Sequence, residues 1–301
     1  FDLQYLRDVC AIVRKDKVDL IQSHLFGSNV YSSIVGLVTG TPVVSTFHGS
    51  VDVSVNERFK WLKFALLNTG SSKVVFVSNY LMRTISQLAK VRSDKATVIY
   101  NGVDTERFSP GRDVSLRREL GLSDDDFLVG AIGNIRPSKA YDILLRAAAL
   151  IARQSTRCKF VIVGEGDGHL LQELLALRKT FGLERDVFLL GFRADTQRVL
   201  NNLDAFVLSS STEGFSISTI EAMASGLPVI ATKSGGPQEI IASGDNGMLV
   251  ESGSPAAIAE AILRLEADQA LRAKLAANGL QHVRNQFSIE AMINSYDHLY
   301  Q

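Results

Sequence analysis

Hydrophobic and polar positions along the chain form two alternating kinds of segment. Short runs rich in Val, Ile and Phe, with the length of a buried strand, are separated by longer stretches with the amphipathic spacing of helices. A strand that lacks a polar face has to be covered on both sides, so this alternation predicts parallel sheets flanked by helices, an α/β fold of the doubly wound type. The strand candidates are residues 18–24, 42–47, 73–78, 96–100, 127–134, 159–164, 186–191, 204–210, 228–232 and 247–250.

The chain is predicted to form two domains. Its 301 residues exceed the length at which a single core usually stops growing, roughly 250–300 residues. The weakest stretch between the two sets of strands is FSPGRDVS, residues 108–115, which places the boundary near Pro110. We therefore expect a Rossmann-like domain over residues 1–110, a second over residues 111–288, and a C-terminal helix over residues 289–301 that can pack back on the first domain.

The chain opens in a helix. Its first apolar residues share one helix face, and no strand precedes them: Phe1, Leu3, Leu6, Val9, Cys10 and Val13. A doubly wound domain ordinarily begins with a strand and a phosphate-facing loop. We therefore expect the first domain to be incomplete, without its opening βα units.

The composition is that of a soluble, core-forming protein. Hydrophobic residues make up 46% and charged residues 21%, and no apolar run approaches the ~18 residues of a membrane span. The net charge of zero argues against a general nucleic-acid binder. Two distant cysteines, Cys10 and Cys158, are expected to be free thiols. With no signal peptide at the start, these features fit a cytoplasmic setting.

The first 110 residues carry an excess of Lys and Arg. The segment Val55–Asn68 gathers Arg58, Lys60 and Lys63 around Trp61, the only tryptophan. Such a helix can lie on an anionic membrane surface, which would place the protein peripherally at the inner face of the membrane. An ordinary amphipathic helix with solvated lysines is the alternative interpretation.

The segment with the most candidate chemistry is STEGFSISTIEAMASGLPVIATKSGGPQEI, residues 211–240. Glu213 and Glu221 stand on either side of the start of a short helix, which Ser216 is expected to cap and Gly226 to end. A carboxylate is an acceptor for hydroxyl groups. A nucleotide sugar offers hydroxyls at both ends of its diphosphate, so the two glutamates fit its sugar and its ribose.

Two glycine turns in this segment suit the diphosphate. Gly214 allows a ligand to approach the backbone, where the N–H groups of Phe215 and Ser216 can meet an anion or a hydroxyl. Gly235 and Gly236 repeat this arrangement before a proline at the start of the next helix.

A further loop with candidate chemistry follows residues 127–134. Arg136 and Lys139 stand before a helix, where cations are unfavourable because the helix dipole prefers anions. A bound anion would explain both residues. Extension of both side chains into solvent is the alternative.

Residues 211–240 resemble the signature of family 4 retaining glycosyltransferases of the GT-B fold, marked by two glutamates in the pattern E-G-F-x5-E-A-M-A-x-G-x-P-V. Segments 45–49, 98–108, 133–145 and 187–193 are similar to family segments, in family order. The resemblance covers essentially the whole chain. It implies a GT-B architecture of two Rossmann-like domains facing a cleft.

The resemblance also implies roles for individual residues. Glu221 would bind the donor ribose, Glu213 would face the transferred sugar, and Lys139 would bind the diphosphate. His48, in the segment FHG, would bring a first-domain group to the reacting sugar. The donor-binding set would further include Asn134, Gly191, Phe192, Arg193, Gly214, Phe215, Ser216, Gly235 and Gly236, with residues 191–193 beside the base.

One departure from the family pattern concerns the diphosphate. The family's arginine usually follows the glycine of the first second-domain loop directly, where this chain has Asn134. Either Arg136 takes over diphosphate binding, or Lys139 acts more alone.

The activity that the resemblance implies is transfer of a hexose-type sugar from a UDP- or GDP-sugar to a hydroxyl acceptor, which is a glycan, a lipid-linked glycan or a small molecule, as in polysaccharide biosynthesis. The nucleotide sugar is a co-substrate. No metal or other cofactor is expected, because cations and helix N-termini can stabilise the departing diphosphate.

Two alternatives remain beside transferase activity. A truncated or catalytically silent module would bind nucleotide without turnover. A glycoside hydrolase would use Glu213 and Glu221 as its carboxylate pair. Eight residues along a helix rise about 12 Å, however, against about 5 Å between the carboxylates of a retaining hydrolase.

Overall fold

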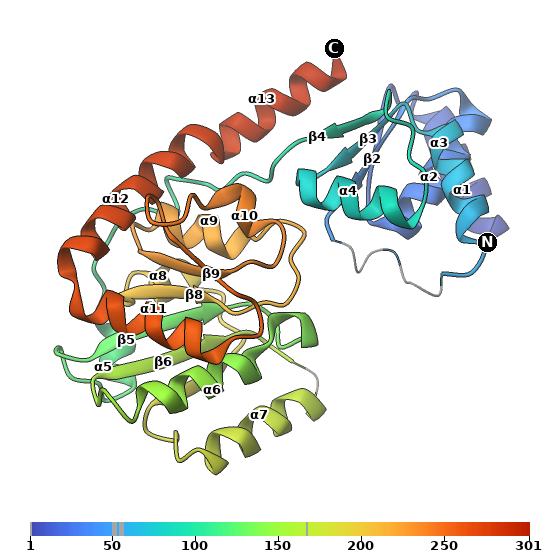
Figure 1. Cartoon of the computed structure of the whole chain (residues 1–301). Coiled ribbons are helices and arrows are strands. Elements are labelled where there is room, and N and C mark those ends of the chain that lie inside the picture. The colour runs from blue at the N-terminus through green and yellow to red at the C-terminus, as the bar shows by residue number, and fades with distance from the viewer. Residues whose placement is uncertain (1, 50–52, 54–56, 167) are drawn as a thin grey trace. The chain divides into compact units, whose positions relative to one another are not determined.

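The structure is a computed structural model that describes residues 2–49, 53, 57–166 and 168–301. The chain divides into two compact units, Phe1–Tyr100 and Asn101–Gln301 (Figure 1). Each of the runs predicted as strands contains a strand, and every strand pairing is parallel.

The segment between the two sets of strands belongs to unit 2 by its hydrogen bonds. The Val103 N–H donates to the carbonyl of Phe287 at 2.8 Å, and the Ile289 N–H donates to the carbonyl of Val103 at 2.9 Å. Unit 2 therefore begins ahead of Pro110, where the turn residues had suggested the boundary, and it includes the C-terminal helix α13 (Ile289–Tyr300).

Unit 1 is built on a four-stranded parallel sheet in the order β1-β2-β3-β4. Phe47 and Phe76, the last residues of two central strands, are fully buried with ring centroids 5.3 Å apart. The strands are β1 (Ile21–His24), β2 (Val43–Phe47), β3 (Lys73–Phe76) and β4 (Ala96–Val98), and the helices are α1 (Leu3–Lys15), α2 (Phe26–Thr39), α3 (Lys60–Gly70) and α4 (Asn79–Leu88).

Unit 2 is built on a six-stranded parallel sheet in the order β10-β9-β8-β5-β6-β7. The strands are β5 (Phe127–Ile132), β6 (Cys158–Val163), β7 (Val187–Gly191), β8 (Ala205–Leu208), β9 (Val229–Thr232) and β10 (Met248–Val250). Besides α13, the helices are α5 (Ser115–Glu119), α6 (Tyr141–Ile151), α7 (Gly168–Thr180), α8 (Thr196–Leu200), α9 (Ile217–Ala224), α10 (Pro237–Ile240), α11 (Pro255–Ala267) and α12 (Gln269–Gln286).

Both faces of the unit 2 sheet are covered, as the nearly continuous apolar strands predict. One face packs on α6, α7 and α11 through a core that includes Leu145, Phe160 and Val207. The other face meets α5 and α8 at Leu116 and Val199. Burial of a Leu, Val or Phe side chain contributes roughly 1.5–3 kcal/mol to folding stability, so these two layers stabilise the sheet that carries the loops.

The strand order positions the candidate site. β5 lies between β6 and β8, and the direction of connection reverses at the β5–β8 pair. The loops that follow these two strands diverge there, and ligands of open α/β sheets bind in the crevice that this divergence leaves.

Candidate functional site

Three loops meet at the carboxyl ends of β5, β8 and β9. The Ser211 N–H donates to the carbonyl of Ser138 at 2.8 Å, and the Ser209 hydroxyl donates to the carbonyl of Lys139 at 2.8 Å. The Glu213 N–H donates to the carbonyl of Ser234 at 2.8 Å. Together these bonds fix residues 133–140, 209–216 and 233–237 as one assembly at the switch point.

Lys139 and Glu213 form an ion pair in this assembly, with Nζ 2.7 Å from Oε1. Their side chains are only 19% and 15% exposed, so water screens the pair weakly. The Ser210 hydroxyl donates to the same carboxylate oxygen at 2.7 Å. The site thus holds a cation and a carboxylate that neutralise one another.

Tyr141 is a buried residue close to Glu213. Its hydroxyl donates to the carbonyl of Gly133 at 2.8 Å. Burial raises the pKa of Tyr141, and the nearby charge of Glu213 raises it further. The phenol therefore stays protonated at neutral pH and acts as a donor that holds the end of β5.

Gly235 and Gly236 support the Glu213 loop. The Gly236 N–H donates to the carbonyl of Glu213 at 3.0 Å, and the Gly235 N–H donates to the Gln238 side chain at 3.2 Å. A Cβ on Gly236 would lie 2.4 Å from the Cα of Phe215. Both N–H groups expected to meet the diphosphate already have partners, so the role that the geometry supports for these glycines is close packing of two loops.

The start of α9 differs from the expected capping. Ser216 occupies the N-cap position, but its side chain makes no capping bond. Its hydroxyl instead pairs with that of Thr219 at 2.9 Å, because Ser216 has φ 134, a strained value for a residue with a side chain. The first turn of α9 therefore lacks a side-chain cap. Its end at Gly226, with φ +74, is as predicted.

Glu221 lies in α9 and is mostly buried. Burial raises the pKa of its carboxyl group, and the positive charge of Arg107 opposes that shift. Among the described residues no hydrogen bond contributes to the shift. A mostly buried carboxylate without a strong partner is costly.

Replacing Glu221 by glutamine should stabilise the protein and weaken nucleotide binding. Because the pKa of Glu221 is higher in the folded protein than in the unfolded chain, stability falls as the pH rises from the unfolded-state pKa through the folded-state pKa. The gain should therefore be complete at pH 7 and vanish at acidic pH, where the carboxyl is protonated in both states. We expect the free energy of unfolding to rise by roughly 0.5–2 kcal/mol at pH 7, the usual size of the gain from one stabilising substitution. Denaturation at both pH values and calorimetric titration with UDP measure the two effects. The matched variant Glu260→Gln, at an exposed position of α11, should change neither quantity.

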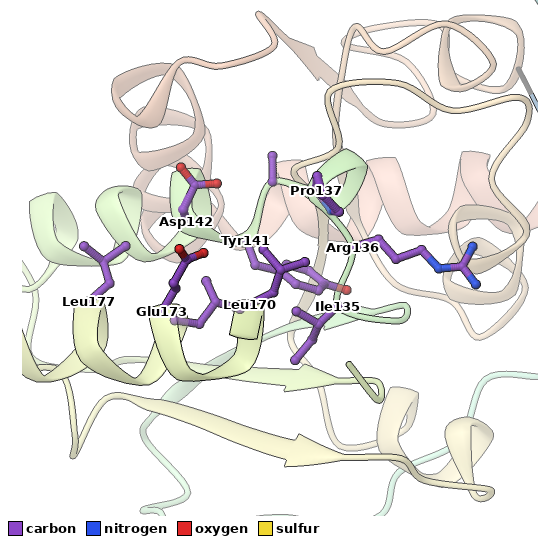
Figure 2. Close-up of a pocket in the computed structure, with 10 residues that line it drawn as sticks. Ile135, Arg136, Pro137, Tyr141, Asp142, Leu170, Glu173 and Leu177 are labelled. Carbon is purple, nitrogen blue, oxygen red and sulfur yellow. The ribbon is translucent and has the colours of Figure 1, made fainter. Parts of the chain in front are cut away.

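Arg136 and Asn134 are both exposed on the loop after β5. Arg136 borders a hollow of about 350 Å³ beside α7, and Figure 2 shows its side chain extending away from Leu177. The lining includes the carboxylates of Asp142 and Glu173 and several leucines. This hollow does not suit a diphosphate, whereas an Arg136 side chain directed away from it is compatible with the diphosphate role.

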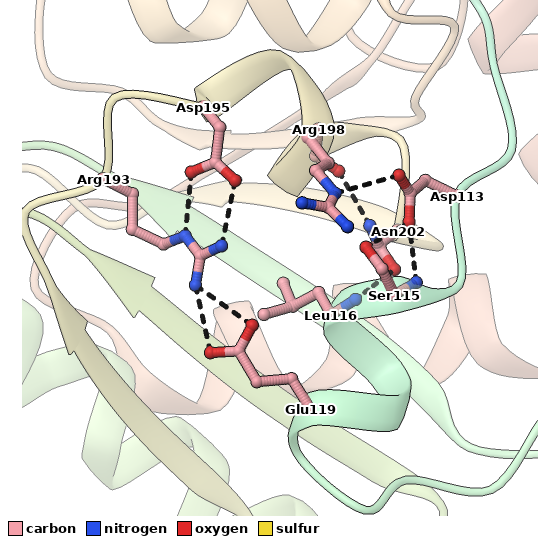
Figure 3. A network of polar contacts seen from close by, with 8 residues as sticks. All are labelled: Asp113, Ser115, Leu116, Glu119, Arg193, Asp195, Arg198 and Asn202. Carbon is pink, nitrogen blue, oxygen red and sulfur yellow. Dashed lines mark hydrogen bonds and ion pairs between the residues drawn. The ribbon is translucent and has the colours of Figure 1, made fainter.

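In residues 191–193, the segment expected beside the base, the arginine side chain is held by two carboxylates. The Arg193 guanidinium donates twice to Asp195, at 2.9 Å each, and to Glu119 at 3.1 Å (Figure 3). These carboxylates raise its pKa. The Arg193 side chain therefore fixes the loop, and Gly191, with φ 68, and Phe192, which is 70% exposed, are the parts of this segment open to a ligand.

A further ion pair, between Arg198 and Asp113, lies in the same region. Arg198 donates to Asp113 at 3.1 Å, and Asn202 accepts a hydrogen bond from the Leu116 N–H at 3.2 Å (Figure 3). Hydrogen bonds from Ser115 lower the pKa of Asp113 to about 2, so this carboxylate is charged throughout the physiological range. The network joins α5 to α8 near β7, the strand at one edge of the sheet.

His48 belongs to unit 1, just beyond the end of β2. Its Nε2 lies 2.8 Å from Nδ1 of His24, the last residue of β1. His24 was not predicted as a site residue, because a single histidine at the end of a strand carries no pattern. The proximity of His48 to a reacting sugar stays a prediction.

The family model described as Glycosyl transferases group 1 matches residues 114–282, more than half of the chain. The chain belongs to this family. The model described as Glycosyltransferase Family 4 matches residues 1–107.

Similar proteins include UDP-Gal:alpha-D-GlcNAc-diphosphoundecaprenol alpha-1,3-galactosyltransferase of Escherichia coli, 28% identical over 99% of this chain and 79% of that protein. A D-inositol 3-phosphate glycosyltransferase of Actinosynnema mirum is 34% identical over 88% of the chain and 68% of its own length. Among solved structures, Anabaena HepE in complex with UDP and glucose has a TM-score of 0.89 and 26% identity, covering 98% of this chain and 80% of that one.

These comparisons confirm the predicted family, the GT-B fold class and the glycosyltransferase activity. The group 1 match contains the whole Lys139–Glu213 assembly and Glu221. The individual site roles stay predictions, as does independence from metal. Among the described residues no cluster of His, Cys, Asp and Glu suits a metal ion.

The structure adds one part of the site that the motif did not predict. The Ser209 hydroxyl donates to the backbone carbonyl of Lys139, and the Ser210 hydroxyl donates to the carboxylate of Glu213. Their signal in the sequence is a run of small hydroxyl residues directly after a buried strand, which is weak because serines are common in any loop.

Proposed function

We propose that this glycosyltransferase moves a hexose-type sugar from a UDP-sugar to a hydroxyl acceptor with retention of configuration. The observation that carries the proposal is the joint placement of Lys139, Glu213 and the uncapped start of α9 at the switch point of unit 2. The choice of UDP is supported by UDP in complexes of the similar HepE and by the name of the Escherichia coli relative.

The chemistry follows from these charges. Cleavage of the sugar–phosphate bond leaves a nucleoside diphosphate and an oxocarbenium-like sugar. Lys139, with Arg136 beside it in the loop, would stabilise the diphosphate, and the first turn of α9 would add N–H groups that have no partner within the helix. Glu213, once separated from Lys139, would accept hydrogen bonds from the sugar, and Glu221 from the ribose. For retention, the acceptor hydroxyl attacks from the leaving group's face and a phosphate oxygen takes its proton.

A panel of donors tests this function. UDP-, GDP- and ADP-hexoses are compared for thermal stabilisation of the protein and for turnover with lipid-linked and soluble acceptors. We expect stabilisation by UDP-sugars and release of UDP. Nucleotide binding without turnover on any acceptor would favour the silent module, and release of free sugar from a glycoside without nucleotide would favour the hydrolase.

A lipid-linked acceptor is the acceptor class that we propose, together with peripheral contact at an anionic membrane surface. The Escherichia coli relative is named for a diphosphoundecaprenol acceptor. In unit 1, Trp61 is 74% exposed and Phe59 56% exposed, and both neighbour basic residues, Arg58 and Lys60. Val55 and Asn56 of the predicted basic segment lie outside the described residues. In the part of the chain that is described, no helix has the length and apolar character needed to cross a bilayer.

Trp61 offers a direct test of membrane contact, because it is the only tryptophan. Vesicles that contain anionic lipid should shift its fluorescence to shorter wavelength and sediment the protein, whereas zwitterionic vesicles should do neither. Trp61→Ser should weaken sedimentation, and the matched change Phe192→Ser, at an exposed aromatic of unit 2, should leave it unchanged. Equal sedimentation of both variants with the parent would contradict contact near Trp61.

A further inference from the structure

His24 and His48 form a hydrogen-bonded pair of imidazoles in unit 1. Nδ1 of His24 lies 2.8 Å from Nε2 of His48, and the ring centroids are 5.1 Å apart with a tilt of 32°. β1 and β2 pair in parallel with His24 opposite Thr46, so the ends of the two strands bring the rings together.

The end of β1, where His24 lies, is braced against the end of β2, which His48 follows. The amide of Asn29, fully buried in α2, donates to the carbonyl of Thr46 at 3.0 Å and accepts from the Ser23 hydroxyl at 2.8 Å. Leu25, which follows His24 in the sequence, has φ 70 and ψ 147, an unfavourable conformation for a leucine. Strain of this kind persists only where the surroundings enforce it, and it gathers at functional sites.

The bond between the rings couples their proton states. In the neutral pair a single proton lies between Nδ1 of His24 and Nε2 of His48, so one ring donates and the other accepts. If His24 donates, His48 carries its proton on Nδ1; if His48 donates, His24 carries its own on Nε2. The outer nitrogens therefore exchange donor and acceptor roles together, and the tautomer of His48 depends on His24.

We propose that His24 is a positioning residue that sets the ring orientation and tautomer of His48 during sugar transfer. The inference rests on the proposed transferase function and on the role beside the reacting sugar that the family resemblance implies for His48. Misplacement of a reacting group by about 1 Å can cost roughly 100-fold in rate. Loss of the His24 contact should therefore lower kcat while leaving nucleotide binding by unit 2 intact.

Three substitutions test the proposal. His24→Ala should lower kcat about 10- to 100-fold, with unchanged affinity for UDP. His24→Asn places an amide where Nδ1 lies and should recover most of the rate, whereas His24→Gln places its amide near Nε2 and should not. Equal activity of all three variants with the parent, or equal loss in the Asn and Gln variants, would overturn the proposal.

Nitrogen NMR of the imidazoles provides a readout independent of activity. The ¹⁵N shifts of His48 should report one dominant neutral tautomer in the parent and a changed tautomer ratio in His24→Ala, with recovery in His24→Asn. Unchanged His48 shifts in His24→Ala would refute the coupling. If the parent transfers no sugar from any donor, the proposed function fails, and the NMR result still decides whether His24 sets the state of His48.

Discussion

Replacing Lys139 by methionine should lower kcat/KM by about 100- to 1,000-fold, the effect of removing one preorganised group that stabilises a departing anion. Methionine keeps the length and apolar contacts of the lysine stem but cannot donate to a diphosphate. Steady-state kinetics with a UDP-sugar, together with UDP titration, measure the loss. Because we propose that Lys139 meets charge that develops as the bond breaks, we expect most of the effect in kcat.

Lys159→Met is a matched control. Lys159, at the start of β6 and thus the opposite end of the sheet, pairs with Asp186 at 2.6 Å and is 15% exposed, close to the burial of Lys139. Both variants lose a mostly buried ion pair, so their stabilities should fall similarly, while only Lys139→Met should lose activity. Comparable kinetic loss in both would mean that the effect of Lys139 is structural.

Replacing Gly236 by alanine should abolish most activity and destabilise unit 2. The new Cβ would lie 2.4 Å from the Cα of Phe215 and 2.6 Å from the carbonyl oxygen of Gly214. Both atoms belong to backbone, so the loop that carries Glu213 must move. We expect a fall of about 1–3 kcal/mol in the free energy of unfolding and a rate loss of 100-fold or more, measured by denaturation and initial rates.

Gly168→Ala separates this clash from a general effect of losing a glycine. Gly168 begins α7, and a Cβ there would meet no heavy atom within 4 Å. Its replacement should leave activity unchanged, and stability should stay the same or rise slightly, because alanine favours a helix. Wild-type rates in Gly236→Ala would show that the two loops can separate without consequence.

The strands and the fold class were predictable because their physical signal is local. A run such as Phe127–Ile132 is apolar at nearly every position, and only a sheet covered on both faces buries such a run. The two-unit division was likewise expected from length. Its position at Tyr100 was not, because the bonds of Val103 to Phe287 and Ile289 join residues far apart in the sequence.

The candidate site was predictable as a set of residue types but not as a set of contacts. The glutamates and glycines stand in one segment, and the resemblance assigns their roles. Contacts such as Lys139 to Glu213 or Arg193 to Glu119 depend on which strands are neighbours. The contact of the Ser216 hydroxyl was not predictable either. The strained backbone of the loop directs it to Thr219 and overrides the usual preference of serine for capping.

The Lys139–Glu213 pair is an internal salt, in which the cation already has a counter-ion. On the role proposed for Lys139, a diphosphate would enter by exchanging with Glu213 and not by filling an unbalanced positive pocket. The exchange is costly for a bare nucleotide, which leaves a mostly buried carboxylate uncompensated, and less costly for a nucleotide sugar, whose hydroxyls take up that carboxylate. The site would thus favour its substrate over its own product, and the departure of the sugar would itself promote release of the nucleotide.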